Sequence, residues 1–284
     1  MQKSLSLDIA AYCHMGLIRK NNEDNLFIDG QYLDNEALKL PFQFDTVNHG
    51  KASLLAVCDG MGGEEFGEEA SSIAVQMLAK YWLEAVKPKA NFKQTLQQYF
   101  DATNSLICQK IVEKGKRMGT TLALLAFQNN QFTAVNIGDS RIYQYRNGKL
   151  MQISADHTQA QTLIRSGALK VADARNHASW NKLTQHLGIF PDELIIEPYF
   201  LLNQNMQDND QWLICSDGLT DLLDDPDIKA IFDQSKPVAQ IGSILVNTAL
   251  NRGGHDNITV IVIKAKRKSI FGNIGSLVKR RKAG

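Results

Sequence analysis

The sequence has few cysteines, and no motif pairs them. The four stand far apart, at Cys13, Cys58, Cys108 and Cys215, with no Cys-x-x-Cys among them. Cys58 and Cys215 lie within apolar runs, so we expect buried, reduced thiols and not a disulfide framework. None lies in an arginine-containing loop that could cradle a phosphate, which argues against cysteine-based catalysis. Reduced thiols predict a cytoplasmic setting.

Segments for export, membrane insertion and nucleotide binding are also missing. The N-terminus has no charged region followed by an apolar stretch, so no signal peptide is predicted. No apolar run reaches the length of a membrane span. The glycine-rich segment 59–63 is no dinucleotide fingerprint, and no Gly-Lys-Ser/Thr follows it. At 284 residues and 44% hydrophobic content, the chain can bury a sizeable core.

Acidic and basic residues are unevenly distributed. Residues 264–284 carry eight Lys/Arg and no Asp/Glu. Residues 1–263 therefore hold 23 basic and 30 acidic side chains, a net charge of about −7. An acidic body suits a site that collects metal ions better than a nucleic-acid surface, so no nucleic-acid partner is expected.

Hydrophobic periodicity predicts an α+β protein. Val-, Ile- and Leu-rich runs predict strands, and apolar stripes of helical spacing predict three long helices. The expected strands are 5–13, 25–29, 52–58, 120–127, 132–137, 141–145, 150–153, 195–202, 211–216 and 257–264, and the helices are 67–82, 91–114 and 237–251. Helices and antiparallel hairpins in separate blocks favour stacked sheets covered by helices.

Aspartates next to or near glycine recur where four apolar runs begin or end. The four are Asp59, Asp139, Asp217 and Asp256. A carboxylate at the end of a buried strand is unfavourable unless it is paired, and four of them make sense if they meet around cations. Mg²⁺ and Mn²⁺ prefer oxygen ligands, and glycine lets backbone carbonyls approach as further ligands. Taken singly, each aspartate fits a turn residue better than a metal ligand.

Arg19 stands four residues before the pair Glu23 and Asp24. Alone, this segment could be a solvated charged turn. If it faces the aspartates, the arginine fork suits phosphate, and the acids suit outer-shell contacts to metal-bound water. Asp59 would then bridge two cations and the Gly60 carbonyl would cap one. Two metals about 3.5–4 Å apart make a potent nucleophile from the water between them.

Seven short motifs resemble, in order and spacing, those of the PP2C family of metal-dependent protein phosphatases, in its bacterial form. They are Arg19-x-x-x-Glu23-Asp24, Asp59-Gly60-x-Gly62-Gly63, Met118-Gly119-Thr120-Thr121, Gly138-Asp139-Ser140-Arg141, Asp156-His157-Thr158, Ser216-Asp217-Gly218-Leu219 and Asp256-Asn257. The resemblance covers about residues 5–265. It implies a four-layer αββα sandwich, two antiparallel sheets flanked by helices. It also implies hydrolysis of phosphoserine and phosphothreonine by metal-activated water, without a phosphoenzyme.

The resemblance further implies two or three Mn²⁺ or Mg²⁺ ions. Asp59 and Gly60 resemble the bridging ligands, and Asp217 and Asp256 resemble the remaining ligands of the core pair. Asp139, together with Asp217, resembles a third-metal site. On this reading Asp59 and Asp217 are catalytic as well as metal-binding.

Arg19 resembles a catalytic phosphate clamp, and Glu23 and Asp24 resemble water-mediated ligands. The implied partners are phosphorylated proteins and a cognate bacterial Ser/Thr kinase, and we expect a monomer. Methionine at position 61 departs from animal members, which often have a histidine there, and methionine cannot donate a proton. His157 is either a proton carrier or a structural histidine hydrogen-bonded near Thr158.

Three segments make up the expected domain organisation. Residues 1–266 form the phosphatase-like domain, and about 158–182 form a variable flap beside the site. In the flap, candidates for touching a phosphoprotein are Arg165, Lys170, Arg175 and Trp180, or this surface is simply solvated and mobile. Residues 267–284 form a basic tail.

The basic tail has two readings. Its apolar residues fall on one helical face before a Lys279–Lys282 cluster, a pattern suited to weak contact with an anionic membrane surface or an acidic partner. Gly272 and Gly275 weaken such a helix, so a disordered, solubilising tail is the alternative.

Two other functions compete with the phosphatase. One is a catalytically silent phosphatase-like module that binds partners. The other is a different two-metal phosphoesterase, such as a nuclease. The intact set of aspartates argues against a silent module, because a decayed site would be expected to lose at least one of them.

Overall fold

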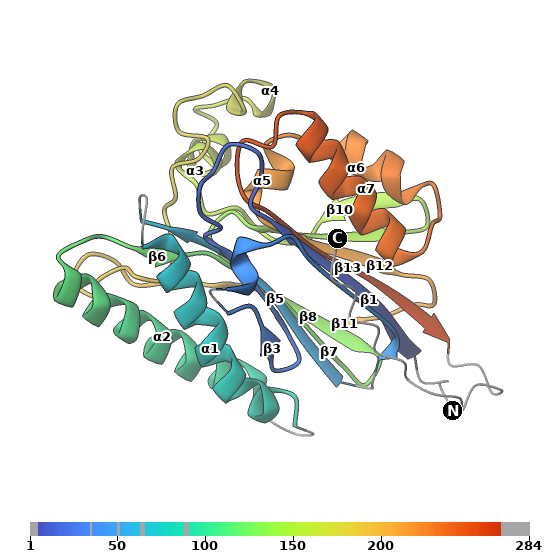
Figure 1. Cartoon of the computed structure of the whole chain (residues 1–284), viewed down its shortest axis with the longest axis horizontal. Coiled ribbons are helices and arrows are strands. Elements are labelled where there is room, and N and C mark those ends of the chain that lie inside the picture. The colour runs from blue at the N-terminus through green and yellow to red at the C-terminus, as the bar shows by residue number, and fades with distance from the viewer. Residues whose placement is uncertain (1–4, 35, 50–51, 63–65, 88–90, 268–284) are drawn as a thin grey trace.

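Two antiparallel sheets pack face to face, with helices on both outer sides (Figure 1). The computed structural model describes residues 5–34, 36–49, 52–62, 66–87 and 91–267. Every strand pairing within the described residues is antiparallel. The predicted α+β class and its four layers are confirmed.

The first sheet has the strand order β10-β9-β12-β13-β1-β4. Two of its interior strands join the two ends of the described chain, because β1 lies along β13 over ten residues, from Leu5 opposite Arg267 to His14 opposite Ile258. The strands are β1 (Leu5–His14), β4 (Phe42–His49), β9 (Arg141–Arg146), β10 (Lys149–Gln152), β12 (Gln211–Cys215) and β13 (Ile258–Arg267).

The second sheet has the order β11-β8-β7-β5-β2-β3, and β6 pairs with the end of β5. The predicted Asn129-Asn130 turn joins β7 to β8, with both asparagines in the left-handed region at φ 53° and 59°. The strands are β2 (Asp24–Ile28), β3 (Gln31–Tyr32), β5 (Ala52–Met61), β6 (Gly119–Thr120), β7 (Leu122–Gln128), β8 (Gln131–Ile137) and β11 (Tyr199–Asn205).

Helices cover the outer face of each sheet (Figure 1). The long helices α1 (Gly67–Ala85) and α2 (Phe92–Lys114) pack on the second sheet, and their apolar stripes form one core with it. The first sheet packs against α5 (Asp217–Thr220), α6 (Asp225–Phe232) and α7 (Val238–Asn251). A third core lies between the sheets, where Trp212 meets Phe127 and Phe132 edge to face.

Shorter elements complete the chain and mark where sequence patterns were weaker. The predicted flap contains α3 (Gln159–Arg165) and α4 (Val171–Ala174), and η1 (Ala37–Lys39) precedes β4. Strand β4 and helix α6 were not predicted. The strand expected at 195–202 begins only at Tyr199, directly after Pro198, a residue that cannot donate to the ladder.

Two predicted segments reach the limits of the described chain. Strand β13 runs to Arg267, one residue beyond the expected end of the domain. The rest of the predicted tail, 268–284, lies outside the described residues. Within the described part, no helix combines the length and apolar character that crossing a membrane requires.

Close packing of α7 on β1 yields a stability prediction. A Cβ on Gly242 would lie 2.4 Å from Cε2 of the buried Tyr12 ring. Alanine favours a helix interior by about 1 kcal/mol over glycine. We nevertheless expect Gly242→Ala to lower the free energy of unfolding by about 1–3 kcal/mol, because the ring must shift.

Urea unfolding followed by circular dichroism measures this effect. Asn247→Ala on the same helix is the matched control, since Asn247 is exposed and its substitution should leave stability equal or higher. A Gly242→Ala protein as stable as the wild type would contradict the packing.

Candidate metal centre

A cleft of about 360 Å³ gathers most of the predicted site residues. Seven of the eight line it, and Asp24 is buried beside it at 1% exposure. The lining residues are Arg19, Glu23, Asp59, Gly60, Met61, Gly62, Thr121, Asp139, Asn181, Leu183, His186, Asp217 and Asp256. Asn181, Leu183 and His186 were not predicted, and they come from the end of the flap and the segment after it.

Strand direction brings the carboxylates together. Asp59 lies near the end of β5, and Asp139 follows β8, which runs in the same direction because both pair antiparallel with β7. In the other sheet, Asp217 follows β12 and Asp256 precedes its antiparallel neighbour β13. Each sheet thus presents two aspartates at one edge, and the two edges meet at the cleft.

Asp59 and Asp24 lie opposite each other on neighbouring strands. They are register partners in β5 and β2. Hydroxyl groups form hydrogen bonds to the Asp59 N–H and to the Asp24 carboxylate. Thr121 Oγ1 accepts a hydrogen bond from the Asp59 N–H at 3.0 Å. The Ser216 hydroxyl donates to Asp24 Oδ2 at 2.7 Å. These hydroxyls hold each strand end in place, so the two carboxylates are pre-positioned.

Asn257 fastens the Arg19 loop to the start of β13. Its side-chain amide donates to the carbonyls of Met15 and Asn21 at 2.8 and 2.9 Å, and its Oδ1 accepts from the Glu23 N–H at 2.7 Å. Asn257 is therefore a positioning residue, a role that the sequence motif Asp256-Asn257 did not predict. The signal was its place beside Asp256.

Arg19 lies at the mouth of the cleft. Its Nη2 is 2.5 Å from Asp256 Oδ2 and its Nη1 is 4.0 Å from Glu23 Oε2. Nearly half of its side-chain surface, 47%, remains exposed. The guanidinium is thus oriented by two acids and still open to an anion from solution.

Gly60 admits no side chain. A Cβ there would lie 2.0 Å from the Gly67 carbonyl oxygen and 2.7 Å from that of Glu23. The Gly60 N–H donates to the Glu23 carbonyl at 3.1 Å. This close approach ties the loop after β5 to the Arg19 segment.

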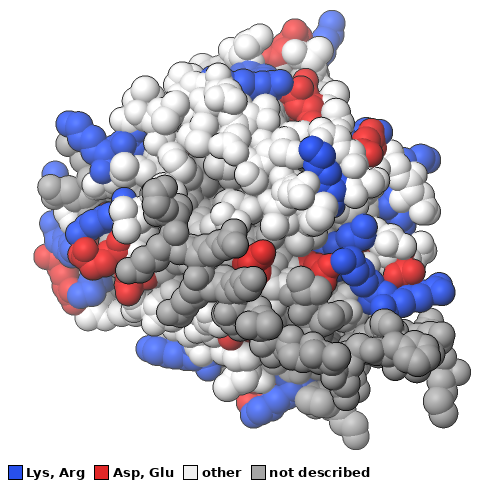
Figure 2. Space-filling view, turned by 45° about the vertical axis from the view of Figure 1, so that its right-hand side comes forward, with Lys and Arg blue, Asp and Glu red and all other residues white. Residues whose placement is uncertain are grey.

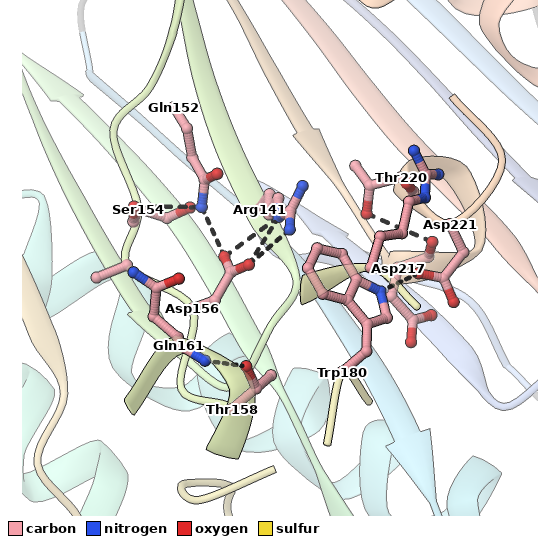
Figure 3. A network of polar contacts seen from close by, with 12 residues as sticks. Arg141, Gln152, Ser154, Asp156, Thr158, Gln161, Trp180, Asp217, Thr220 and Asp221 are labelled. Carbon is pink, nitrogen blue, oxygen red and sulfur yellow. Dashed lines mark hydrogen bonds and ion pairs between the residues drawn. The ribbon is translucent and has the colours of Figure 1, made fainter. Parts of the chain in front are cut away.

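A second, larger cavity of about 580 Å³ shares Asp139, Asn181 and Asp217 with the cleft. Figure 3 shows that its polar side chains are largely engaged with one another. Arg141 pairs with Asp156 at 2.7 Å and lies 5.5 Å from the ring centroid of Trp180.

Two of the four flap candidates fasten the flap to α5. Trp180 Nε1 donates to Asp221 at 3.0 Å, and Arg175 donates to the Thr220 carbonyl at 2.8 Å. The other two candidates, Arg165 and Lys170, are exposed.

The crowded carboxylates resist ionisation. Removal from water raises the pKa of Asp24 to about 7, although the Ser216 hydroxyl opposes the rise. Burial, followed by the charges of Asp221 and Asp256, raises the pKa of Asp217 to about 7. Burial and neighbouring aspartates also raise the pKa of Asp59 and Asp139 well above the ordinary range. A bound cation would lower these pKa values, because its positive charge favours the ionised carboxylates.

The donor set fits hard divalent cations. Glu23 Oε1 is buried without a hydrogen-bond partner, and four further carboxylates and the Gly60 carbonyl are close by. Within the described ranges, no three His, Cys, Asp or Glu side chains already form a ready-made metal site. One of these carboxylates, that of Asp256, is paired with Arg19.

Two histidines near the cleft are held by backbone groups. His157 Nδ1 accepts from the Gly138 N–H at 3.2 Å, which is consistent with the structural alternative for this residue. His186 Nδ1 lies 3.0 Å from the Leu187 carbonyl. Burial lowers the pKa of both rings, so both favour the neutral form at neutral pH.

Known proteins resemble this chain over most of its length. The family model for protein phosphatase 2C matches residues 42–251. The chain is 33% identical over 261 residues to the serine/threonine protein phosphatase PstP of Mycobacterium tuberculosis, a match that covers 91% of this chain and 45% of PstP. The chain thus spans about half the length of that relative.

Two further comparisons cover nearly all of the other protein. Protein phosphatase PhpP of Streptococcus pneumoniae is 34% identical over 219 residues, 76% of this chain and 87% of PhpP. The crystal structure of the PstP catalytic domain with two manganese ions superposes with a TM-score of 0.73 at 31% identity, and the match covers 92% of this chain and 99% of that one.

The raised pKa values predict how stability depends on pH. Protonated Asp24 and Asp217 favour the folded state fully below about pH 4, and this contribution is lost as the pH rises through about 7. Metal-free protein should therefore lose stability over this range. Added Mn²⁺ should raise the melting temperature more at about pH 7.5 than at about pH 5, because ions bind the deprotonated carboxylates.

Thermal unfolding of EDTA-treated protein, with and without Mn²⁺, measures both effects. Asp217→Asn isolates the carboxylates from other titrating groups, because it should flatten the pH profile and shrink the Mn²⁺ gain. A variant that keeps the wild-type profile and the full gain would contradict this reading of the site.

Proposed function

Because the chain belongs to the protein phosphatase 2C family, we propose that it hydrolyses phosphoserine and phosphothreonine in proteins with the help of two or three Mn²⁺ or Mg²⁺ ions. One observation carries the proposal. Aspartates from four strand ends line a single cleft, and Arg19 stands open at its mouth. PstP, whose catalytic domain binds two manganese ions, supports the choice of metal.

Each carboxylate has a proposed role in holding the ions. Asp59 and the Gly60 carbonyl would hold the bridged pair together with Asp217 and Asp256, and Asp139 with Asp217 would hold a third ion. When bound, the ions supply Lewis-acid charge and lower the pKa of water. The protein's own contribution is to fix these oxygens at strand ends, so that little reorganisation is needed.

Arg19, Glu23 and Asp24 would act around that centre. Arg19 would exchange its contact with Asp256 for a charge-assisted contact with the substrate phosphate. Glu23 carries the unpartnered buried oxygen, and Asp24 is held by Ser216, so both suit hydrogen bonds to water at the ions. Met61 lines the cleft but offers no proton for the leaving alkoxide.

We propose phosphorylated proteins as substrates and a bacterial Ser/Thr kinase as the enzyme that this phosphatase opposes. The names of the relatives support the first part, because they are Ser/Thr protein phosphatases. All four cysteines are buried free thiols, which supports a reducing, cytoplasmic setting. A monomer remains a prediction.

Charges of both signs are mixed on the part of the surface that is described and shown in Figure 2. Lys and Arg side chains there lie beside Asp and Glu side chains, with uncharged surface between them. The expectation that the chain has no nucleic-acid partner stays a prediction, which the net acidic charge of residues 1–263 supports. The contact of the tail with anionic membranes or an acidic partner concerns residues outside the described chain and stays a prediction.

Turnover of a phosphothreonine peptide by EDTA-stripped protein tests the proposal. We expect no release of phosphate without metal, and restored release with Mn²⁺. Asp59→Asn should lower kcat by at least about a hundredfold, a loss typical of removing one preorganised electrostatic group, while the fold is retained. Phosphate release by malachite green and circular dichroism provide the two readings.

Other outcomes would favour the competing functions. A folded protein that binds phosphopeptide but never turns it over with any divalent metal would be a binding module. Activity on nucleic acid but not on phosphopeptides would indicate a nuclease. Near-normal turnover by Asp59→Asn would refute the metal assignment.

Arg19→Lys tests the phosphate clamp. Lysine keeps the positive charge but loses the planar fork. We expect kcat/KM for the phosphopeptide to fall about 10- to 100-fold, the effect of a lost hydrogen bond to a charged group. Lys20→Arg, in the same exposed loop, should keep wild-type kinetics. An Arg19→Lys enzyme with unchanged kcat/KM would rule out a bidentate role.

A further inference from the structure

A separate pocket of about 300 Å³ adjoins the metal cleft on the side of Met61. It shares Met61, Gly62 and His186 with the cleft, so the two spaces lie side by side with these residues between them. We call it the Met61 pocket. Its lining residues are Met61, Gly62, Arg117, Met118, Gly119, His186, Gly188, Ile189 and Glu193.

The walls of the Met61 pocket are mainly apolar. Met118 and Ile189 are among the lining residues, and they are only 3% and 8% exposed. The two charged lining residues, Arg117 and Glu193, form a bidentate ion pair with each other. Arg117 also lies 5.1 Å from the ring centroid of Phe190. Among the described lining residues, the two charges are thus paired with each other.

The pocket is rigidly supported. The buried Asn104 of α2 accepts hydrogen bonds from the N–H groups of Gly188 and Ile189, at 2.7 and 3.2 Å, and donates to the Ile189 carbonyl at 2.9 Å. Thr120 and Leu187 exchange a pair of backbone hydrogen bonds at 3.0 and 2.9 Å. A preformed pocket binds with less ordering cost than a mobile surface.

The cavity on the other side of the cleft differs in character. Its Arg141, Asp156, Trp180 and Asp221 already contact one another (Figure 3). A ligand there would have to replace these contacts. The Met61 pocket presents open apolar walls instead, which an apolar group can cover without breaking a bond.

We propose that the Met61 pocket receives an apolar side chain of the phosphoprotein, one or two residues away from the phosphorylated Ser or Thr. The inference rests on the proposed function. An extended chain advances about 3.3–3.6 Å per residue, so a neighbouring side chain reaches a pocket that shares a wall with the cleft. A volume at the low end for ligand pockets suits one side chain.

In this pocket Met61 would bind an apolar group, a role that needs no proton donor. An unbranched, polarizable side chain adapts to differently shaped apolar groups. Because Met61 lines both the cleft and the pocket, its side chain would contact the residue next to the phosphorylated one. The substrate class is then phosphopeptides with a large apolar neighbour.

A phosphothreonine peptide series tests the proposal with Mn²⁺-loaded enzyme. Each of the two positions on either side carries Leu, Ala or Asp in turn, and kcat/KM is measured. At one position we expect Leu to exceed Ala by about tenfold or more, the discrimination that an apolar pocket provides. Equal kcat/KM for all three residues at every position would overturn the proposal.

Two variants of one wall residue then locate the preference. Ile189→Ser should reduce the Leu-to-Ala ratio at that position toward one, and Ile189→Phe should reverse it by filling the space. The matched control is Ile195→Ser, because Ile195 is 75% exposed outside the pocket and should keep the wild-type ratio. A full ratio in both folded Ile189 variants would contradict the location, and melting curves confirm folding.

A binding assay separates this proposal from the proposed function. The same peptides are made with a non-hydrolysable phosphonate, and their affinities are measured by fluorescence polarisation. A Leu preference in affinity without turnover of the phosphopeptides would refute the phosphatase and support the pocket. Turnover with equal affinities and equal kcat/KM would leave the phosphatase and refute the pocket.

Discussion

Carboxylates of like charge lie close together in the cleft, and their mutual repulsion is the interaction that the surrounding structure must oppose. Asp24 and Asp59 lie opposite each other on neighbouring strands. Asp217, which follows a strand of the other sheet, lies close to them. Burial and this repulsion raise the pKa of all three. Holding these groups together lowers the stability of the folded state when divalent cations are absent. Bound cations would raise that stability.

The scaffold opposes this repulsion with short, specific contacts. Thr121 accepts from the Asp59 N–H, and Ser216 donates to Asp24 and accepts from the Thr259 N–H of β13. Asn257 ties the Arg19 loop to β13. The side chains of these three residues are uncharged. They act by placing charged neighbours on rigid elements, which is how a preorganised site avoids reorganisation during a reaction.

Sequence alone predicted β5, β12 and β13, because most of their residues are buried on both faces and the sequence there is mainly apolar. It missed β4, an edge strand whose described side chains are at most half-buried. It also missed α6, although Asp224, Pro226 and Asp227 spell a capping box with proline in the first turn.

For the site, sequence motifs named the carboxylates but not their supports or their surroundings. Asn257 bonds to residues more than 230 positions away, and Asn104 supports a pocket wall about 85 positions away. Such contacts follow from the packing of distant elements and leave no local pattern. Three separate segments of the chain line the Met61 pocket, so no single sequence motif predicts it.

The position of the ions tests the central claim most directly. Anomalous diffraction at the manganese edge, from crystals grown with Mn²⁺, would locate them without reference to activity. We predict two strong peaks flanking the Asp59 carboxylate, with Asp217, Asp256 and the Gly60 carbonyl as neighbours. Well-ordered crystals with no peak among these oxygens, or with manganese bound only elsewhere, would contradict the account.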